Sequence, residues 1–198
     1  IITGASSGIG ADAAIKLSTI YDHLFIFGNT HIHELEQVSK TIISNECACD
    51  IYLGDLSDYD FVHGAALDII SKASRIDALI NNAGISSVGL FTEMSKESWD
   101  RIFSVNVDSV YNMCHAVVPH MINQKEGRIL NISSVWGISG ASCEVAYSAT
   151  KGAINSFSKA LAKELAPSNI SVNAIAFGAI DTTMNGHLTN EDIDLLNA

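Results

Sequence analysis

Short runs of apolar residues alternate along the chain with longer stretches in which apolar positions recur every three or four residues. The short runs predict β-strands, and these are Ile1–Thr3, Leu24–Gly28, Cys49–Leu53, Ala78–Asn81, Arg128–Ser133 and Ile170–Ala174. Each run is nearly continuous in apolar residues, which is expected for strands that are covered on both faces.

The longer stretches have the period of an amphipathic helix. They predict helices at Ile9–Tyr21, His33–Ser44, Phe61–Ser74, Ser95–Asn123 and Val145–Ala166. Ser95, with Glu97 close behind it, is typical of a capped helix start. Pro167 should end the last helix, because proline cannot continue the hydrogen-bond ladder.

This alternation of strands and helices predicts an α/β fold. We expect one Rossmann-like domain over residues 1–198, with a doubly wound parallel sheet and helices on both of its faces. The length suits a single domain, and the chain has no internal repeat or linker. Ligands of such folds bind beyond the carboxyl ends of the strands, so the residues that follow each strand are the candidate site.

The charge of the chain narrows the classes of partner. It has 11 Lys and Arg against 22 Asp and Glu, a net charge of −11. Few basic residues are available to displace counterions from phosphate, so we expect neither nucleic acid nor a membrane as a partner. The absence of a CxxC pair and of a secretory signal favours a cytoplasmic protein with reduced thiols. His31 and His33 lack further ligands at a suitable spacing, so no metal site is predicted.

A glycine-rich turn joins the first strand to the first helix. Gly4, Gly8 and Gly10 lie in it. Glycine lets a backbone approach a pyrophosphate closely, and the helix start adds free N–H groups and the positive end of the helix dipole. The spacing differs from the common G-x-G-x-x-G pattern, but the strand–turn–helix context favours a dinucleotide site.

Tyr147 and Lys151 are four residues apart at the start of a predicted helix and therefore share a face. An ammonium close to a phenol lowers a pKa that is about 10 when free. A tyrosine of this kind can exchange a proton near neutral pH. The alternative is an amphipathic helix on which both side chains face water.

These motifs together resemble the short-chain dehydrogenase/reductase family. The residues that carry the resemblance are Thr3-Gly4-x-x-x-Gly8-x-Gly10, Asn81-Asn82-Ala83-Gly84, Asn106, Ser134 and Tyr147-x-x-x-Lys151. They occur in the family's order and span nearly the whole chain. The resemblance implies hydride transfer between a nicotinamide cofactor and a ketone or secondary alcohol.

The resemblance also implies a role for each catalytic residue. Tyr147 would protonate the developing alkoxide, and Ser134, rather than its neighbour Ser133, would hydrogen-bond the same oxygen. Lys151 would lower the pKa of Tyr147 and hold the nicotinamide ribose. Asn106 would anchor a water that relays protons to Lys151, unless it is a satisfied core amide.

The family's cofactor contacts carry over to a further set of residues. They are Gly4, Ser6, Ser7, Gly8, Ile9 and Gly10 at the pyrophosphate, Asn29 at the adenosine ribose, Asp55 and Leu56 at adenine, Asn81, Ala83 and Gly84 at the ribose, Tyr147 and Lys151 as above, and Gly178, Ile180 and Thr182 at the carboxamide. Phe177 stands where the family usually has proline, which leaves the path of that loop open.

The choice between NAD(H) and NADP(H) depends on the end of the second strand. Gly28-Asn29-Thr30 holds neither the acid that favours NAD nor the arginine that favours NADP, and Ser7 replaces the basic residue of many NADP users. Small polar side chains can bind a phosphate through N–H and O–H groups. We therefore favour NADP(H) over NAD(H) as the cofactor.

Within the family the chain is similar to 3-oxoacyl-(acyl-carrier-protein) reductases. A narrower likeness, over Ser134–Tyr147 and Met184-Asn185, is to aminopentanone reductases that act on a modified lysine of elongation factor P. Glu144 would then pair with a substrate amine and Trp136 would line the substrate site. The alternative for Glu144 is an acid in the first turn of a helix, where the helix dipole favours it. The alternative for Trp136 is ordinary packing.

The expected partners are a small-molecule or protein-tethered ketone and further copies of the chain. The resemblance implies a homodimer or homotetramer that pairs through Ser95–Asn123 and Val145–Ala166. It also implies that an N-terminal start, a C-terminal lid and a last strand lie outside this sequence, with residues 190–196 beginning the lid. Two other functions stay open: a sugar-nucleotide epimerase and a non-catalytic cofactor-binding module.

Overall fold

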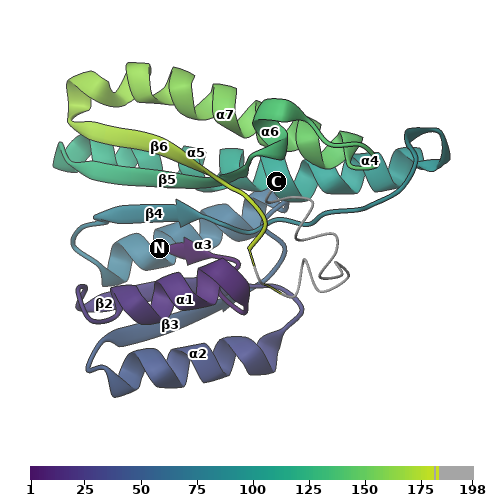
Figure 1. Cartoon of the computed structure of the whole chain (residues 1–198). Coiled ribbons are helices and arrows are strands. Elements are labelled where there is room, and N and C mark those ends of the chain that lie inside the picture. Colours follow the sequence, from purple (N-terminus) through teal and green to yellow (C-terminus); the bar gives the residue numbers. More distant parts are fainter. Residues whose placement is uncertain (181, 183–198) are drawn as a thin grey trace.

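The computed structural model describes residues 1–180 and 182, and a parallel sheet forms its centre (Figure 1). Its strands are β1 (Ile2–Thr3), β2 (His23–Gly28), β3 (Ala48–Leu53), β4 (Ala78–Asn81), β5 (Gly127–Ser134) and β6 (Ile170–Phe177). Within these residues the sheet has six strands in the order β3-β2-β1-β4-β5-β6, and every pair is parallel. The predicted Rossmann-like fold is confirmed, with its switch point between β1 and β4.

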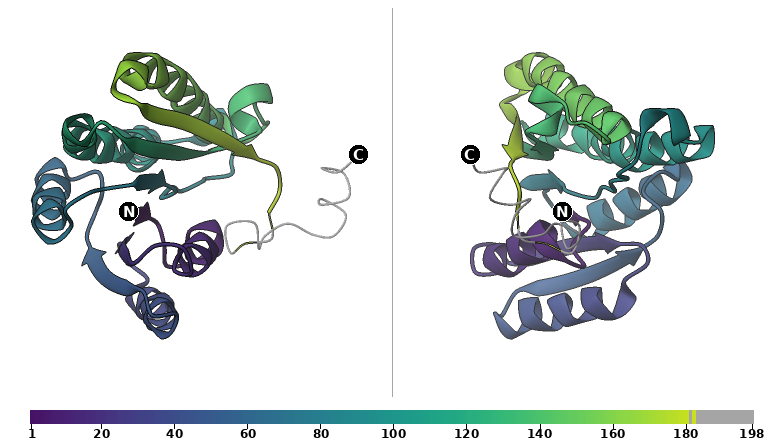
Figure 2. Two further views of the ribbon diagram at one scale, coloured as in Figure 1. Left: turned by 90° about the vertical axis from the view of Figure 1, so that its left-hand side faces the viewer. Right: turned by 45° about the vertical axis from the view of Figure 1, so that its right-hand side comes forward.

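Helices cover both faces of the sheet (Figure 2). They are α1 (Gly8–Leu17), α2 (Ile32–Ser44), α3 (Tyr59–Lys72), α4 (Lys96–Phe103), α5 (Ser109–Gln124), α6 (Trp136–Ser139) and α7 (Val145–Leu165), with a π-turn η2 (Ser104–Asp108) and the 3-10 turns η1 (Phe91–Glu93) and η3 (Ala166–Ser168). No helix among the described residues has the length and apolar content that a bilayer crossing requires.

Two apolar cores hold the helices to the sheet. On one face α1 and α2 pack against the strands through Ala14, Leu35 and Ile42. On the other face α3, α5 and α7 contribute Val62, Met113, Ile154 and their neighbours. Burial of one such side chain contributes about 1.5–3 kcal/mol, so apolar burial stabilises the helices on both faces of the sheet.

The edge strands differ from the prediction. β3 has no fully buried position, and β6 exposes Asn173, Ala174 and Ile175. The expectation that all strands are covered on both faces is therefore wrong for β3 and β6, because helices cover the middle of a sheet more completely than its edges. β6 also continues past Ala174 to Phe177, where it pairs with Ser134 of β5.

The predicted helix Ser95–Asn123 is confirmed as one helical stretch made of α4, η2 and α5. It begins as predicted, since the Ser98 N–H donates to the Ser95 side chain at 3.1 Å, and η2 is a π-segment within it. A π-turn inserts an extra residue into a helix and often lies at a functional site. Here it contains Asn106, whose side chain bonds backbone outside the helix.

Candidate active site

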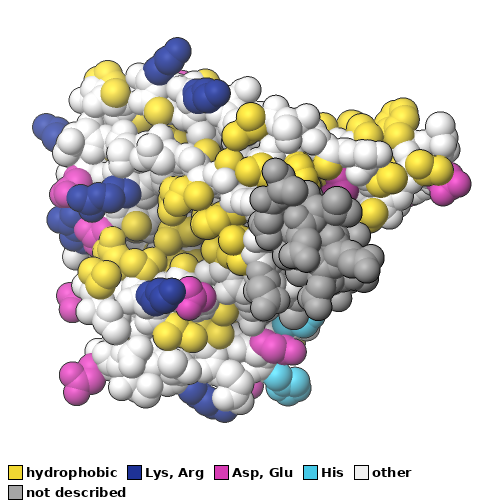
Figure 3. Space-filling model, in the orientation of Figure 1, with side chains coloured by type: hydrophobic (Ala, Val, Ile, Leu, Met, Phe, Trp, Pro, Cys, Tyr) yellow, Lys and Arg dark blue, Asp and Glu magenta, His cyan; other side chains and the backbone are white. Residues whose placement is uncertain are grey.

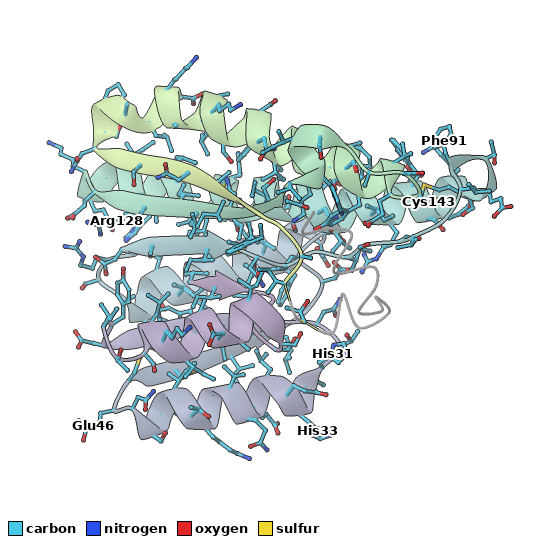
Figure 4. All side chains as sticks on the ribbon, in the orientation of Figure 1. His31, His33, Glu46, Phe91, Arg128 and Cys143 are labelled. Atoms are coloured by element: carbon cyan, nitrogen blue, oxygen red, sulfur yellow. The ribbon has the colours of Figure 1, made fainter. Side chains whose placement is uncertain are left out.

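A large cavity lies at the carboxyl ends of the strands, where the loops from all parts of the sheet meet. Its volume is about 1190 Å³. Small-molecule pockets are commonly about 300–1,000 Å³, so this cavity has room for a dinucleotide together with a second molecule. His31 lies at this end of the sheet in Figure 4, whereas Glu46 and Arg128 lie at the opposite end.

Most of the residues predicted from the sequence lie in the cavity wall. They are Gly4, Ser6, Ser7, Gly8, Ile9, Asn29, Asp55, Leu56, Ala83, Gly84, Ser134, Trp136, Glu144, Tyr147, Lys151, Gly178, Ile180 and Thr182. Three others, Gly10, Asn81 and Asn106, are buried behind the wall. Met184, Asn185 and residues 190–196 lie outside the described residues.

The turn between β1 and α1 offers an anion site. Gly4 and Gly8 have φ values of +63° and +54°, a region that side chains with a Cβ rarely adopt. The first turn of α1 contains no acidic residue, and the N-cap Ser7 makes no side-chain hydrogen bond to it. Its backbone N–H groups and the positive end of its dipole are therefore available to a phosphate, and these residues fit a dinucleotide.

Asn82 fastens this turn to β4, a role that the sequence did not reveal. Its Nδ2 donates to the carbonyl oxygens of Thr3 and Gly4 at 3.1 and 3.0 Å. The Thr3 hydroxyl in turn accepts from the backbone N–H groups of Asn82 and Ala83 at 2.9 and 3.1 Å. These contacts depend on β1 lying beside β4, and that arrangement exists only in the folded sheet.

Ser134, Tyr147 and Lys151 converge on one side of the cavity. The Ser134 hydroxyl hydrogen-bonds the Tyr147 phenol, and Ser134 Oγ accepts from the Trp136 N–H at 3.2 Å. Lys151 Nζ lies 5.5 Å from the centre of the Tyr147 ring and donates to the Ile132 carbonyl oxygen at 2.8 Å. Ser133 points elsewhere, since its hydroxyl donates to the backbone carbonyl of Lys151 at 3.3 Å.

The electrostatics of Tyr147 differ from the expectation. Burial raises the pKa of Tyr147 above its ordinary value, the Ser134 hydrogen bond lowers it, and the Glu144 carboxylate raises it. The prediction of a lowered pKa for Tyr147 is therefore wrong, and Lys151 is not among the causes of the shift. The physical reason is that removal of a phenolate from water costs more than its neighbours return.

Lys151 is itself affected by burial. Only 5% of its surface is exposed, and burial lowers its pKa from the ordinary 10.5 to about 8. The amine is still mostly protonated at neutral pH. As an ammonium it can donate hydrogen bonds into the cavity, whose wall it lines.

Asn106 is buried and fully engaged. Its Oδ1 accepts from the Ile85 N–H at 2.8 Å, and its Nδ2 donates to the Ile85 carbonyl at 2.9 Å and to the Thr150 hydroxyl at 3.1 Å. This pattern fixes the loop after β4 against α7. A Cβ on Gly84 would lie 3.2 Å from Asn106 Oδ1 and 3.7 Å from Lys151 Nζ, so both polar groups lie beside Gly84.

Asn81 belongs to the scaffold behind the cavity. Its Nδ2 donates to Asn131 Oδ1 at 2.9 Å, and Asn131 Nδ2 donates to the Ser158 hydroxyl at 2.8 Å. This buried polar ladder ties β4 to β5 and α7. Asn81 thus supports the cavity from behind.

The segment after β6 stays on the cavity wall although Phe177 replaces a proline. The Phe177 carbonyl accepts from the Val135 N–H at 2.9 Å, which fixes the end of the strand beside α6. Gly178, Ala179 and Ile180 then line the cavity. This bond uses a carbonyl oxygen, which a proline at this position would also offer.

An apolar arm, residues 87–93, projects from the molecule beside the cavity (Figures 3 and 4). It exposes Val88, Leu90 and Phe91, and the Gly89 N–H donates to the Cys143 carbonyl at 2.8 Å. The arm continues directly from Ser86, which lines the cavity.

Comparison with known proteins shows a match to the family model described as short chain dehydrogenase over residues 1–193. The chain is 38% identical over 188 residues to a 3-oxoacyl-[acyl-carrier-protein] reductase of Thermotoga maritima, covering 95% of this chain and 76% of that one. It is 40% identical over 190 residues to an uncharacterized oxidoreductase of Bacillus subtilis, covering 96% and 77%.

A solved structure is also similar. It is NAD+-bound xylitol dehydrogenase, with a TM-score of 0.84 and 29% sequence identity, over 88% of this chain and 67% of that chain.

Proposed function

The chain belongs to the short chain dehydrogenase family, and we propose that it reduces 3-oxoacyl thioesters with a reduced nicotinamide dinucleotide. It is an oxidoreductase acting on CH–OH or C=O groups. The observation that carries this proposal is the convergence of Ser134, Tyr147 and Lys151 on a cavity that also contains an anion-binding helix start. The similarity to 3-oxoacyl-[acyl-carrier-protein] reductases supports the substrate class.

The chain's own residues account for the proton transfer. When bound, the nicotinamide supplies the hydride that the carbonyl carbon accepts. Ser134 and Tyr147 line the same cavity and interact with each other, so a substrate oxygen placed between them would receive a hydrogen bond from each. Because the pKa of Tyr147 is raised, its phenol is protonated at neutral pH and can act as the general acid of the reducing direction.

A direct assay tests this proposal. Purified protein is mixed with NADPH or NADH and with an acetoacetyl thioester, and loss of the reduced-nicotinamide absorbance is followed. We expect turnover that requires the thioester. Cofactor binding without turnover of this ketone or of an aminoketone would instead support a non-catalytic binding module.

The cofactor proposal rests on the end of β2. The cavity there is lined by Asn29, Thr30 and His31, which offer an amide, a hydroxyl and an imidazole and no carboxylate. Such groups can bind a 2′-phosphate, so we propose NADP(H) as the preferred cofactor. The similar xylitol dehydrogenase is NAD+-bound, and parallel titrations with both reduced cofactors decide between them.

Glu144 favours a second substrate class, an aminoketone, free or tethered to a protein as in the aminopentanone reductases. Its carboxylate lies in the cavity wall one helical turn before Tyr147 and accepts from the Ser86 hydroxyl at 3.1 Å. A carboxylate held there can pair with a substrate ammonium. We expect Glu144→Gln to raise KM about tenfold for a cationic aminoketone and to leave KM for a neutral acetoacetyl thioester within about twofold.

Glu93→Gln is the matched control, because Glu93 is an exposed acid on the projecting arm. It should leave both KM values unchanged. If wild type and Glu144→Gln have equal KM values for the aminoketone, aminoketones are excluded as a substrate class recognised by Glu144.

Glu144 should also set the pH dependence of the reduction of a neutral ketone. Its charge raises the pKa of Tyr147, so Glu144→Gln lowers that pKa. Reduction requires the protonated phenol, and its rate therefore falls as pH rises through the pKa of Tyr147. The variant should lose activity at a lower pH than wild type. A pH–kcat profile with the alkaline limb unmoved, or moved upward, would contradict this assignment.

We propose that the chain forms a homodimer or homotetramer through α5 and α7. Tyr111 and Ile122 are exposed on α5, and Ala149 and Ser156 are exposed on α7. The molar mass in solution tests the assembly.

A further inference from the structure

An ion pair fastens the loop after β3 to α4 at the cavity wall. Arg101 Nη1 lies 2.7 Å from Asp55 Oδ2 and 3.4 Å from Ser57 Oγ, and all three residues line the cavity. We propose that Arg101 is a positioning residue that orients the Asp55 carboxylate to accept a hydrogen bond from the amino group of the cofactor's adenine. This inference rests on the proposed function, because it requires a bound dinucleotide.

The hydrogen bonds to Asp55 leave a single acceptor position. Asp55 Oδ1 accepts from the Ser57 N–H at 2.9 Å and from the Ser57 hydroxyl at 2.7 Å, and Oδ2 accepts from Arg101. Two carboxylate oxygens offer about four lone-pair directions in total. The remaining direction is on Oδ2, the atom that Arg101 holds. Arg101 therefore determines where a ligand N–H can be accepted.

The same contacts keep Asp55 charged. Burial alone raises the pKa of Asp55, but the hydrogen bonds from Ser57 and the Arg101 guanidinium outweigh it and hold the pKa below the ordinary value. An ionised carboxylate only accepts hydrogen bonds. It suits an amino group as partner, whereas a carbonyl oxygen at the same place would be repelled.

The backbone of this loop has its own anchor. Asn112 Nδ2, buried on α5, donates to the carbonyl oxygens of Leu56 and Ser57 at 2.9 and 3.2 Å. Removal of the Arg101 guanidinium should therefore free Asp55 Oδ2, while Oδ1 keeps its bonds to Ser57 and the loop stays in place. This separates the positioning role of Arg101 from a purely structural one.

A pair of cofactors that differ at one position provides the test. The first probe is whichever reduced dinucleotide wild type binds more tightly, NADPH or NADH. The second probe is the deamino analogue of that cofactor. In the analogue hypoxanthine replaces adenine, so a carbonyl oxygen replaces the amino group. Dissociation constants are measured at equilibrium by nicotinamide fluorescence, without substrate. We expect wild type to prefer the adenine form about tenfold, and Arg101→Gln to reduce this preference to about twofold or less.

Two further variants serve as comparisons. Arg75→Gln removes an arginine of similar exposure that pairs with Asp77 and Glu126 away from the cavity, and it should keep the full preference. Asp55→Asn should abolish the preference, and the double variant Asp55→Asn/Arg101→Gln should match Asp55→Asn alone, because Arg101 acts through Asp55.

The outcomes are distinct. An unchanged preference in Arg101→Gln overturns this inference while the proposed function stands. An equal loss of affinity for both cofactors in Arg101→Gln also overturns it, because that pattern indicates general damage to the site. Failure of wild type to bind either cofactor overturns the proposed function and this inference together.

Discussion

Tyr147→Phe is expected to lower kcat for ketone reduction about a thousandfold while the dissociation constant for the reduced cofactor changes by less than about twofold. General acid catalysis contributes roughly 10²–10⁴-fold to rate, and the phenol is the group in the cavity wall that is both protonated at neutral pH and bonded to Ser134. Phenylalanine keeps the ring beside Lys151 and removes the hydroxyl group that carries the transferable proton. Steady-state kinetics with an acetoacetyl thioester and a fluorescence titration of cofactor give the two values.

Tyr111→Phe is the matched control for this experiment. Tyr111 is a half-exposed tyrosine on α5 that does not line the cavity, so its variant should keep wild-type kcat. Equal rates for Tyr147→Phe and wild type would remove Tyr147 from its role. A loss of cofactor binding that accompanies the loss of rate would assign Tyr147 to binding rather than to proton transfer.

Gly10→Ala is expected to lower the free energy of unfolding by about 3 kcal/mol, at the upper end of the usual cost of overpacking. A Cβ on Gly10 would lie 2.2 Å from the Gly4 carbonyl oxygen and 2.4 Å from Asn82 Nδ2. Neither atom can yield easily, because the hydrogen bonds between Asn82 and Gly4 hold them together. Chemical denaturation measures the change. Cofactor affinity should fall as well, since relief of the clash moves the glycine turn.

Gly64→Ala is the comparison that isolates the clash. Gly64 lies inside α3, and a Cβ there would meet nothing within 4 Å. Alanine has the higher helix propensity, so this variant should gain up to about 1 kcal/mol. Similar stabilities for Gly10→Ala and wild type would show that α1 does not pack against the turn at this glycine. A loss of stability in Gly64→Ala would indicate that the helices do not tolerate a glycine-to-alanine substitution in general, and the clash at Gly10 would then not be the cause.

The features that could be predicted from the sequence are those set by residues close together in the chain. The strand runs and helical periods placed all six described strands and most helices to within a few residues, since an apolar period reflects which face an element buries. The glycine turn could be recognised as well, because the φ values of Gly4 and Gly8 restrict those positions to glycine. The site residues that line the cavity follow from the rule that ligands bind at the carboxyl ends of parallel strands.

The features that the sequence did not predict have long-range causes. The π-segment η2 within the long helix contains Asn106, whose bonds reach Ile85 and Thr150, two segments that only the fold brings to it. The direction of the Tyr147 pKa shift depends on burial, which no spacing of Tyr and Lys reveals. The close approach of Gly10 to the Gly4 carbonyl across the turn is likewise a contact that only the fold creates.

By itself, then, the sequence determined the order of strands and helices, the end of the sheet that carries the site, and the residue types that converge there. The tertiary structure alone decided which side chains meet across loops, among them Asn82 on the glycine turn and Arg101 on Asp55, and how far water is removed from Tyr147 and Lys151. The physical reason is that hydrophobic periodicity acts over a few residues. Hydrogen bonding and desolvation act over distances in space, between residues that lie far apart along the chain.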